Sequence, residues 1–445
     1  MNNSYIRQTS RQTDRLHNLL LDVNTITCRG VVTKVSGLLV ESSGPSVSLG
    51  DICWIGGKVN GRKMAAEVIG LRDEKILLMP FADNNGISIG SGVESTRQPL
   101  TVGVGPELLG RVIDGFGNPI DGKGPVGTVR KMDIHNTPPE PLSRPRIVKP
   151  LQTGIRAIDS LLTCGEGQRV GIFAGSGVGK SVLLGMIARN GSADVNVIAL
   201  VGERGREVRE FIERDLGEEG LARSVVVVVT SNEAAVLRIR GAQIATTIAE
   251  FYRDEGKNVV LMMDSITRVA MAQREIGLAI GEPPATKGYT PSVYTLLPRL
   301  LERTGTSACG SITSFYTTLV EGDDLNDPVS DIVRSILDGH IVLSRKIASK
   351  NQYPAVDVLR SVSRLMAGIV DERHLAAAAK ARQVLSTYEE AEDLINIGAY
   401  VRGSNPKIDF AIQHIEKLNR HLSQGMYEEV SFRQGVASLQ NVFEQ

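Results

Sequence analysis

The residues best suited to do chemistry lie in one short stretch, where an apolar segment ends in a glycine-rich turn. The turn and the residues directly after it are Gly175, Ser176, Gly177, Val178, Gly179, Lys180, Ser181 and Val182. Glycines let successive backbone N–H groups point inward at phosphate oxygens, and the following helix aims its positive dipole end at the same anion. We therefore expect Lys180 to reach the β- and γ-phosphates of a nucleotide and the Ser181 hydroxyl to ligate Mg²⁺.

The context of this turn supports its assignment as a phosphate-binding loop. An apolar strand pattern precedes it and an apolar helical pattern follows it, whereas a coincidental Gly-Lys-Ser in a glycine-rich turn needs neither. Ala174 departs from the usual pattern, which begins with glycine. Alanine is small enough there if the position does not require a positive φ.

Two acidic residues follow apolar runs further along the chain. Asp264 ends the run 258–263, at the carboxyl end of a strand, where open α/β sheets bind ligands. We expect it to hold Mg²⁺ from the side opposite Ser181, through water. Glu203 follows the run 195–201, and ATP hydrolysis needs a carboxylate to orient the attacking water. On spacing alone, the charged segment 202–207 fits a solvated loop equally well.

Composition argues against nucleic acid as the main ligand. Lysine plus arginine and aspartate plus glutamate both number 50, so the formal net charge is zero and no strong basic field is expected. Aromatic residues make up only 4%, which leaves few platforms for stacking bases. With 445 residues, the chain has room for two or three domains.

The cysteines and the absence of targeting signals predict a cytoplasmic protein. Cys28, Cys53, Cys164 and Cys309 lie far apart and show neither a zinc spacing nor a disulfide framework, so we expect reduced, buried thiols. The polar N-terminus lacks a signal-peptide core, and no apolar run approaches membrane-spanning length. Any contact with a membrane should be peripheral.

The pattern of apolar residues and turns changes three times along the chain, and these changes predict four segments. Residues 1–22 form an amphipathic helix, and short apolar runs between turns indicate a small β-barrel over 23–98. After a passage rich in glycine and proline, which fits turns and a linker, the 99–370 segment alternates strands and helices. This alternation indicates an α/β domain with a parallel sheet covered on both faces. Residues 371–445 show helical periodicity alone. The expected strands of the α/β domain are 168–174, 195–201, 224–230, 258–263 and 311–317.

The three nucleotide-related segments, in this order, resemble those of the catalytic subunits of rotary ATP synthases. Residues 25–445 follow that family's pattern of β-barrel, RecA-type P-loop nucleotide domain and helical domain. Within the superfamily the chain is most similar to the ATPases of type III protein export, particularly the flagellum-specific ones. The segments that carry this resemblance are 173–186, 281–293, 319–324 and 335–345.

The resemblance implies roles for residues close to the phosphates. Glu203 would be the catalytic glutamate, and Arg204 would contact phosphate. Arg268, four residues after Asp264, would also face the phosphates, although an ordinary ion pair is its simpler explanation. Tyr353 would pack against adenine, with a core aromatic as the alternative.

The resemblance also implies an arginine finger, which stabilises transition-state charge from a neighbouring subunit. Arg364 fits the motif position, and Arg360 is the competing residue. Because one chain carries both Glu203 and Arg364, we expect a homo-oligomeric ring with an active site at each interface. The resemblance implies a homohexamer.

Further partners follow from the resemblance alone. Residues 398–409, a loop that is not acidic as in the synthases, would face a coiled-coil stalk protein, and helix 1–22 would dock a regulatory protein. The export gate and chaperone–cargo complexes would be the remaining partners, with no nucleic acid among them. The expected location is the cytoplasm, peripheral at the inner-membrane base of the flagellar export apparatus.

The expected function is therefore Mg²⁺-dependent ATP hydrolysis that energises export of flagellar proteins. Two alternatives share the fold, namely the ATPase of a virulence-type injection apparatus and a rotary synthase subunit. A third, a ring-shaped RNA-binding factor of the transcription-termination type, needs basic and aromatic surface on its barrel. The barrel segment offers only Trp54 and Phe81 as large aromatics.

Overall fold

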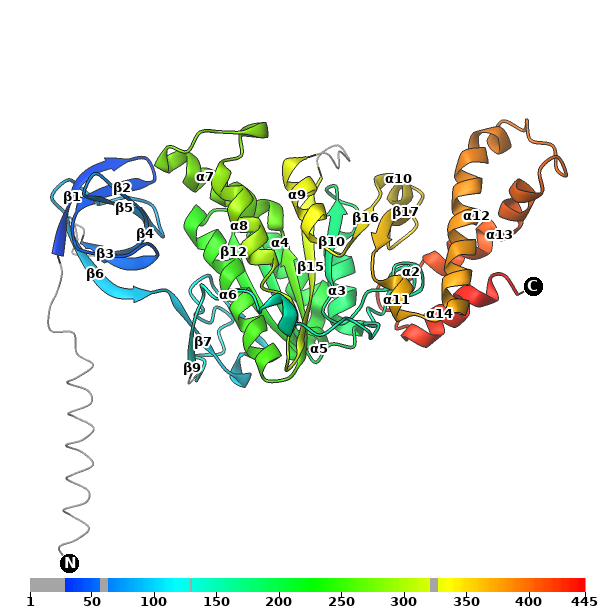
Figure 1. The fold of residues 1–445 in the computed structure, drawn as a ribbon, viewed down its shortest axis with the longest axis horizontal. Coiled ribbons are helices and arrows are strands. Elements are labelled where there is room, and N and C mark those ends of the chain that lie inside the picture. Colours follow the sequence, from blue (N-terminus) through cyan, green and yellow to red (C-terminus); the bar gives the residue numbers. More distant parts are fainter. Residues whose placement is uncertain (1–28, 57–62, 129, 321–326, 445) are drawn as a thin grey trace, which may run out of the picture. The chain divides into compact units, whose positions relative to one another are not determined.

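The computed structural model describes residues 29–56, 63–128, 130–320 and 327–444 (Figure 1). The expected helix 1–22, the residue Cys28 and most of the segment 319–324 lie outside these residues. The chain divides into two units, residues 1–100 and residues 101–445, and each is described by itself.

The first unit contains a closed barrel of antiparallel strands, which confirms the predicted β-barrel. The described strands follow the order β1-β2-β5-β4-β3-β6 around the barrel. Their bounds are β1 Arg29–Ser36, β2 Leu39–Ser43, β3 Asp51–Gly56, β4 Lys63–Arg72, β5 Lys75–Pro80 and β6 Gly92–Pro99. Alternate residues point inward, so that Val32, Val40, Leu78 and Val93 form a small apolar core.

The second unit is built on a nine-stranded sheet in the part of the chain that the structure describes. Its order is β17-β16-β10-β15-β13-β11-β12-β8, with β14 paired to β15. The bounds are β8 Arg111–Ile113, β10 Arg169–Ala174, β11 Val195–Glu203, β12 Ser224–Thr230, β13 Asn258–Asp264, β14 Gly305–Thr306, β15 Ser311–Leu319, β16 Gly339–Leu343 and β17 Val356–Ser363. All five strands expected from the sequence are present, and the parallel arrangement is confirmed for the strands from β16 to β8.

The sheet differs from the expectation in two respects. β17 and β14 run antiparallel to their neighbours, so that the sheet is mixed at these places. The passage rich in glycine and proline is also more than a linker. It supplies β8, which pairs with β12, and β7 (Thr101–Val104), which pairs with β9 (Arg130–Asp133). Strands of three or four residues are too short to show a periodic pattern, which is why the sequence did not reveal them.

Helices cover both faces of the sheet, as the continuous apolar runs of its strands require. The strand β11 is buried at eight successive positions, so neither of its faces meets solvent. Helices α6 to α9 pack successively against one another, and α3, α4 and α5 pack against η3 in a second group. The bounds are α2 Arg156–Leu161, α3 Lys180–Asn190, α4 Gly205–Glu210, η3 Phe211–Leu216, α5 Gly217–Ala222, α6 Ala235–Asp254, α7 Ile266–Ile280, α8 Pro291–Leu301, α9 Pro328–Ile336, α10 Arg345–Ser349 and α11 Met366–Ile369. Short 3-10 turns lie at η1 Pro106–Leu108, η2 Pro141–Ser143 and η4 Thr286–Gly288.

The C-terminal part of the second unit is helical, as the sequence predicts. Its helices are α12 Glu372–Asn396, α13 Pro406–Leu422 and α14 Phe432–Asn441, and all three pack against α2 (Figure 1). Each begins at a side chain that caps a backbone N–H, namely Asp371, Asn405 and Ser431. None of the described helices is long and apolar enough to cross a membrane.

The cysteines follow the expectation only in part. Cys53 and Cys164 are free and buried, but Cys309 is free and exposed. Cys309 lies between β14 and β15, in the turn where Ser307 bonds the backbone of Gly310. Surface turns are exposed because their backbone groups need solvent or local partners.

Candidate active site

The loop between β10 and α3 has the backbone geometry that a phosphate cradle requires. Gly177 and Gly179 adopt φ values of 78° and 90°, in the left-handed region that glycine tolerates without strain. Between them, the side chain of Val178 is 1% exposed and anchors the loop in the apolar core. Ala174 is the last residue of β10 and has no positive φ, so the alanine in place of glycine costs nothing.

The helix after the loop begins at Lys180, with Gly179 as its N-cap. Gly179 offers no side-chain cap, so the first N–H groups of α3 are left for a ligand to satisfy. Gly175 is buried, Ser176 is exposed, and Ser181 and Val182 lie half-buried in the first helical turn. The structure therefore brings all eight loop residues predicted from the sequence to one strand-to-helix turn.

A lysine and two carboxylates converge beside this turn. Lys180 Nζ lies 2.5 Å from Asp264 Oδ1 and 3.8 Å from Glu203 Oε1. Asp264 ends β13 and Glu203 ends the adjacent parallel strand β11, so both acids reach the same edge of the sheet as the loop. The three side chains are 4–15% exposed. Glu203 therefore does not belong to a solvated loop, the alternative that spacing alone left open.

Burial and mutual charge shift the acid–base properties of this group. Burial raises the pKa of Glu203 to about 7, the Asp264 carboxylate adds to the rise, and Lys180 opposes it. Burial by itself would lower the pKa of Lys180, but the neighbouring Asp264 and Glu203 carboxylates raise it above its ordinary value. A carboxyl group whose pKa is raised to near neutral pH, beside a lysine whose pKa is also raised, is typical of a catalytic site.

Thr317 is a site residue that the sequence did not single out. Its hydroxyl donates a 2.7 Å hydrogen bond to Asp264 Oδ1, the same oxygen that pairs with Lys180. Thr317 lies on β15, next to β13 in the sheet, and it is fully buried. The signal available in the sequence was a polar residue at the carboxyl end of an expected strand, the same signal that pointed to Asp264.

Tyr353 and Arg268 lie next to the site, each against a glycine. A Cβ on Gly179 would stand 3.5 Å from the Tyr353 ring, and Tyr353 is 41% exposed, so it is not the core aromatic of the alternative explanation. Arg268 packs its aliphatic stem against Gly202, the residue before Glu203. Its buried Nε has no hydrogen-bond partner among the described residues.

Arg204, Arg360 and Arg364 are not brought to this cluster. The Arg204 side chain is 82% exposed and pairs with Glu207 at 3.5 Å. Arg360 and Arg364 are exposed on and after β17, and Arg364 Nη2 makes one long contact of 3.5 Å with the Arg334 carbonyl oxygen. Because β17 runs antiparallel to β16, Arg364 lies at the edge of the sheet opposite the phosphate loop.

The oxygen donors near the loop suit a hard divalent cation. Ser181 offers a hydroxyl and Asp264 a carboxylate, and Mg²⁺ is usually held by one or two such protein groups together with waters and substrate phosphates. Among the described residues no three His, Cys, Asp or Glu side chains form a ready metal cage. The residues present therefore fit a cation that arrives with a nucleotide.

This fold and this cluster define a P-loop ATPase, and the comparisons with known proteins agree. Residues 154–363 match the nucleotide-binding domain of the ATP synthase alpha/beta family, and residues 32–97 match its beta-barrel domain. Residues 370–441 match the T3SS EscN ATPase C-terminal domain.

Relatives specify the branch of that family. The chain is 58% identical over 411 residues to the flagellum-specific ATP synthase of Bacillus subtilis, covering 92% of this chain and 94% of that protein. It is 51% identical over 395 residues to the type 3 secretion system ATPase of Xanthomonas euvesicatoria, covering 89% of each. The solved structure of the assembled ATPase EscN from enteropathogenic E. coli aligns with a TM-score of 0.88 at 44% identity, covering 93% of this chain and 99% of that one. The chain belongs to the family of flagellum-specific and type III secretion ATPases.

The position of Lys180 predicts a loss of hydrolysis when its ammonium is removed. We expect Lys180→Ala to lower ATP turnover by about 100-fold or more, because a preorganised charge beside the phosphates is lost. Steady-state hydrolysis and nucleotide titration measure the effect, with Lys34→Ala, an exposed barrel lysine, as the matched control. Undiminished turnover in Lys180→Ala would refute the assignment of the loop.

The position of Glu203 predicts a variant that binds but does not hydrolyse. Glu203→Gln keeps the shape of the side chain but cannot accept a proton from water, so turnover should fall by about 100-fold or more. Binding of a fluorescent ATP analogue should stay within experimental error of the parent chain. A collapse of binding would instead make Glu203 a structural residue.

The raised pKa of Glu203 predicts how activity depends on pH. The carboxylate is the active form, so kcat/KM should rise between pH 6 and pH 8 with a midpoint near the pKa of about 7. A pH–rate profile of the parent chain and of Glu203→Gln tests this. The inflection should vanish in the variant; an inflection that survives belongs to another group.

Proposed function

We propose that this chain is a Mg²⁺-dependent ATPase that energises the export of flagellar proteins through a type III apparatus, working as a homohexameric ring. The convergence of Lys180, Asp264 and Glu203 at the phosphate loop is the observation that carries this proposal. The higher identity to the flagellum-specific protein of B. subtilis, 58% against 51% to the X. euvesicatoria secretion ATPase, favours the flagellar system. The injection-apparatus ATPase remains the second candidate and shares the same chemistry.

The division of labour within one site follows from the geometry. The loop N–H groups and Lys180 bind the nucleotide phosphates, and Ser181 and Asp264, the latter through water, hold Mg²⁺, which neutralises charge on the phosphates. Glu203 orients the attacking water and accepts its proton. Arg268, whose buried Nε has no hydrogen-bond partner in the described part of the chain, turns to the phosphates, and the half-exposed Tyr353 ring packs on adenine. Arg204 lies one residue from Glu203 and reaches phosphate by moving out of solvent.

The direction of β10 supports a finger that acts on a neighbouring subunit. Arg364 follows Ser363, which pairs with Gly339 at the start of β16, level with the start of β10. The phosphate loop follows Ala174 at the other end of β10, and five residue steps of a strand span roughly 17 Å. This separation exceeds the length of an arginine side chain. Arg364 therefore serves the site of the next chain, and a head-to-tail ring places it there.

The partners of the ring are proposed from relatives and from the exposed loop after α12. An EscN assembly has been solved in complex with its central stalk EscO, and the chain aligns with that EscN at a TM-score of 0.85 and 43% identity. Residues 398–409 comprise the loop after α12 and the first turn of α13; Val401 within this segment is 70% exposed, and Ile397 directly before it is 75% exposed. We infer that this non-acidic loop contacts a coiled-coil stalk. The regulatory protein at residues 1–22, the export gate, chaperone–cargo complexes and peripheral placement at the cytoplasmic face of the membrane are further parts of the proposal.

The RNA-binding alternative loses support from the barrel surface. Of its two large aromatics, Phe81 is 7% exposed and Trp54 is 40% exposed. A single exposed ring offers no succession of stacking surfaces for a strand of bases.

A trans-acting Arg364 predicts that two inactive variants restore each other. Arg364→Ala and Glu203→Gln rings should each lose turnover, by about 10³-fold in the arginine variant. In mixed rings, some interfaces pair an intact Glu203 with an intact Arg364 from the next chain, and these should recover partial activity. The same mixing with Arg360→Ala in place of Arg364→Ala distinguishes the two arginines. If rings confirmed as mixed by native mass spectrometry stay inactive, Arg364 does not act between chains.

A further inference from the structure

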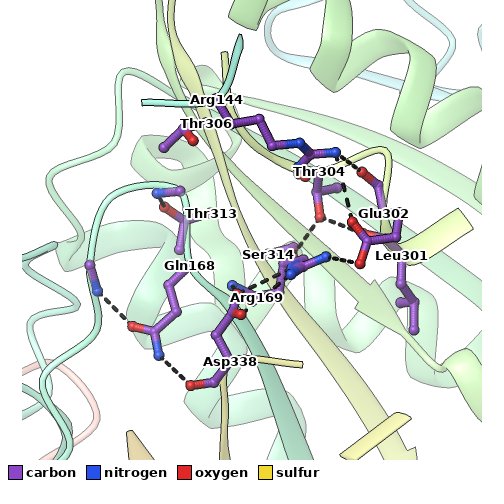
Figure 2. A network of polar contacts seen from close by, with 12 residues as sticks. Arg144, Gln168, Arg169, Leu301, Glu302, Thr304, Thr306, Thr313, Ser314 and Asp338 are labelled. Carbon is purple, nitrogen blue, oxygen red and sulfur yellow. Dashed lines mark hydrogen bonds and ion pairs between the residues drawn. The ribbon is translucent and has the colours of Figure 1, made fainter. Parts of the chain in front are cut away.

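A polar network lies at the edge of the sheet opposite the phosphate loop (Figure 2). It joins Gln168 and Arg169, at the start of β10, to Asp338, the residue before β16. The catalytic cluster contains none of these three residues. Asp338 nevertheless bonds the Arg364 backbone directly, Gln168 bonds Asp338 and the Ser363 side chain, and Arg169 holds the Asp338 carboxylate.

The first contacts hold the Arg364 backbone N–H and the side-chain hydroxyl of the preceding Ser363. The Arg364 N–H donates to the Asp338 carbonyl oxygen at 3.1 Å. Gln168 Nε2 donates to the same carbonyl oxygen at 3.1 Å and to Ser363 Oγ at 3.3 Å. Gln168 is fully buried, and its own Oε1 accepts from the Gly165 N–H at 2.8 Å, which fixes the orientation of the amide.

Asp338 is held from its other side by Arg169. Its Oδ2 accepts from the Arg169 backbone N–H and from Nε, both at 3.1 Å, and its Oδ1 accepts from Nη2 at 3.3 Å. Arg169 Nη1 continues to Glu302 Oε1 at 2.5 Å, after the end of α8 (Figure 2). Charged, multidentate pairs of this kind fix direction as well as distance.

The approach of the two strands at this point is close. A Cβ on Gly339 would stand 2.6 Å from the Val362 carbonyl oxygen and 3.2 Å from Gln168 Nε2. Glycine is therefore required at position 339 for the close β16–β17 contact, which places the Asp338 carbonyl oxygen within hydrogen-bond distance of the Arg364 N–H. The Arg364 side chain, in contrast, is exposed, and among the residues that the structure describes its one hydrogen bond is the long contact with the Arg334 carbonyl.

We propose that Gln168 and Asp338 are positioning residues that aim Arg364 into the active site of the neighbouring chain. This inference rests on the proposed trans role of Arg364. Because the guanidinium itself is weakly held, its direction depends on the backbone from which it projects, and these two residues fix that backbone. Arg169 also begins the strand that leads into the chain's own phosphate loop, and Gln168 directly precedes it. One six-residue strand thus connects each loop to the finger that serves the next site.

The test variant is Gln168→Leu, which keeps the volume of the side chain but removes its hydrogen bonds to the Asp338 carbonyl oxygen and to Ser363 Oγ, together with the bond that it accepts from the Gly165 N–H. We expect kcat to fall about 10- to 100-fold, the scale of a displacement of about 1 Å at a reacting centre. KM and the nucleotide affinity of unassembled chains should not change, because the chain's own loop is intact. Thr306→Val, which removes a hydrogen bond to the Pro145 carbonyl in the same region, is the matched control and should keep the parent kcat.

Mixed rings show on which side of the interface the defect lies. Gln168→Leu mixed with Glu203→Gln should recover activity. At some interfaces the Glu203→Gln chain supplies a well-placed Arg364 to a Gln168→Leu chain whose own Glu203 and phosphate loop are intact. Gln168→Leu mixed with Arg364→Ala should not recover, because both variants lack a well-placed finger. Recovery in this second mixture would mean that Gln168 acts on its own loop, and it would overturn the positioning role.

The reference mixture of Glu203→Gln with Arg364→Ala separates the two ideas. If it fails to recover, the trans role of Arg364 is wrong and the inference falls with it. If it recovers while Gln168→Leu keeps the parent kcat, only the positioning role is wrong.

Should Gln168→Leu not fold, Ser363→Ala replaces it, because this change removes the Gln168 contact and the 2.7 Å bond from Ser363 Oγ to the Thr163 carbonyl. The same recovery pattern is expected, and its absence contradicts the proposal.

Discussion

The direction of β10 is the constraint on which the rest of the active unit depends. The strand begins beside Asp338 and Arg364 and ends in the phosphate loop, and its neighbours β15 and β16 run parallel to it. Parallel strands collect their carboxyl ends at one edge, which places Glu203, Asp264 and Thr317 around Lys180. The same geometry sends Arg364 to the opposite edge. In the proposed mechanism, such a chain holds two halves of a catalytic site at opposite edges of its sheet.

The charges of Lys180, Glu203 and Asp264 at the phosphate loop determine the acid–base properties of this part of the site. Lys180 is buried beside two carboxylates, one of which, Glu203, has its pKa raised to about 7 by burial and by Asp264. Binding of nucleotide phosphates brings negative charge to Lys180, so the lysine is shared between substrate and acids. A water-excluded, preorganised arrangement of this kind stabilises developing charge more strongly than solvent does. The Thr317 hydroxyl donates a hydrogen bond to the same Asp264 oxygen that pairs with Lys180, and this bond restrains the position of that oxygen when the lysine moves.

Much of this arrangement could be predicted from the sequence. The loop at 175–181 carries its motif in consecutive residues, and Asp264 is an acid at the end of an apolar run. Glu203 also follows an apolar run, but spacing alone left it open to a solvated loop, and the resemblance to a known family decided its role. Thr317 carried the same strand-end signal as Asp264 but was not singled out. Gln168 and Asp338 could not be found in this way, because they precede their strands and act through neighbours far away in the chain. The resemblance to a known family supplied Tyr353 and Arg364, but the position of Arg364 at the far edge of the sheet came only from the register of β16 and β17. The short strand β8 and the exposed Cys309 were missed because neither leaves a periodic signal.

The central claim is that each active site is composed of two chains, and the dependence of ATPase rate on assembly tests it most directly. The rate per chain is measured across a dilution series, with the mass of the particles determined on the same samples. If each site is composed of two chains, the ATPase rate per chain should rise in proportion to the assembled fraction. Arg364→Ala should assemble without any increase in the ATPase rate per chain. Monomers that hydrolyse ATP as fast per chain as assembled rings would contradict this claim.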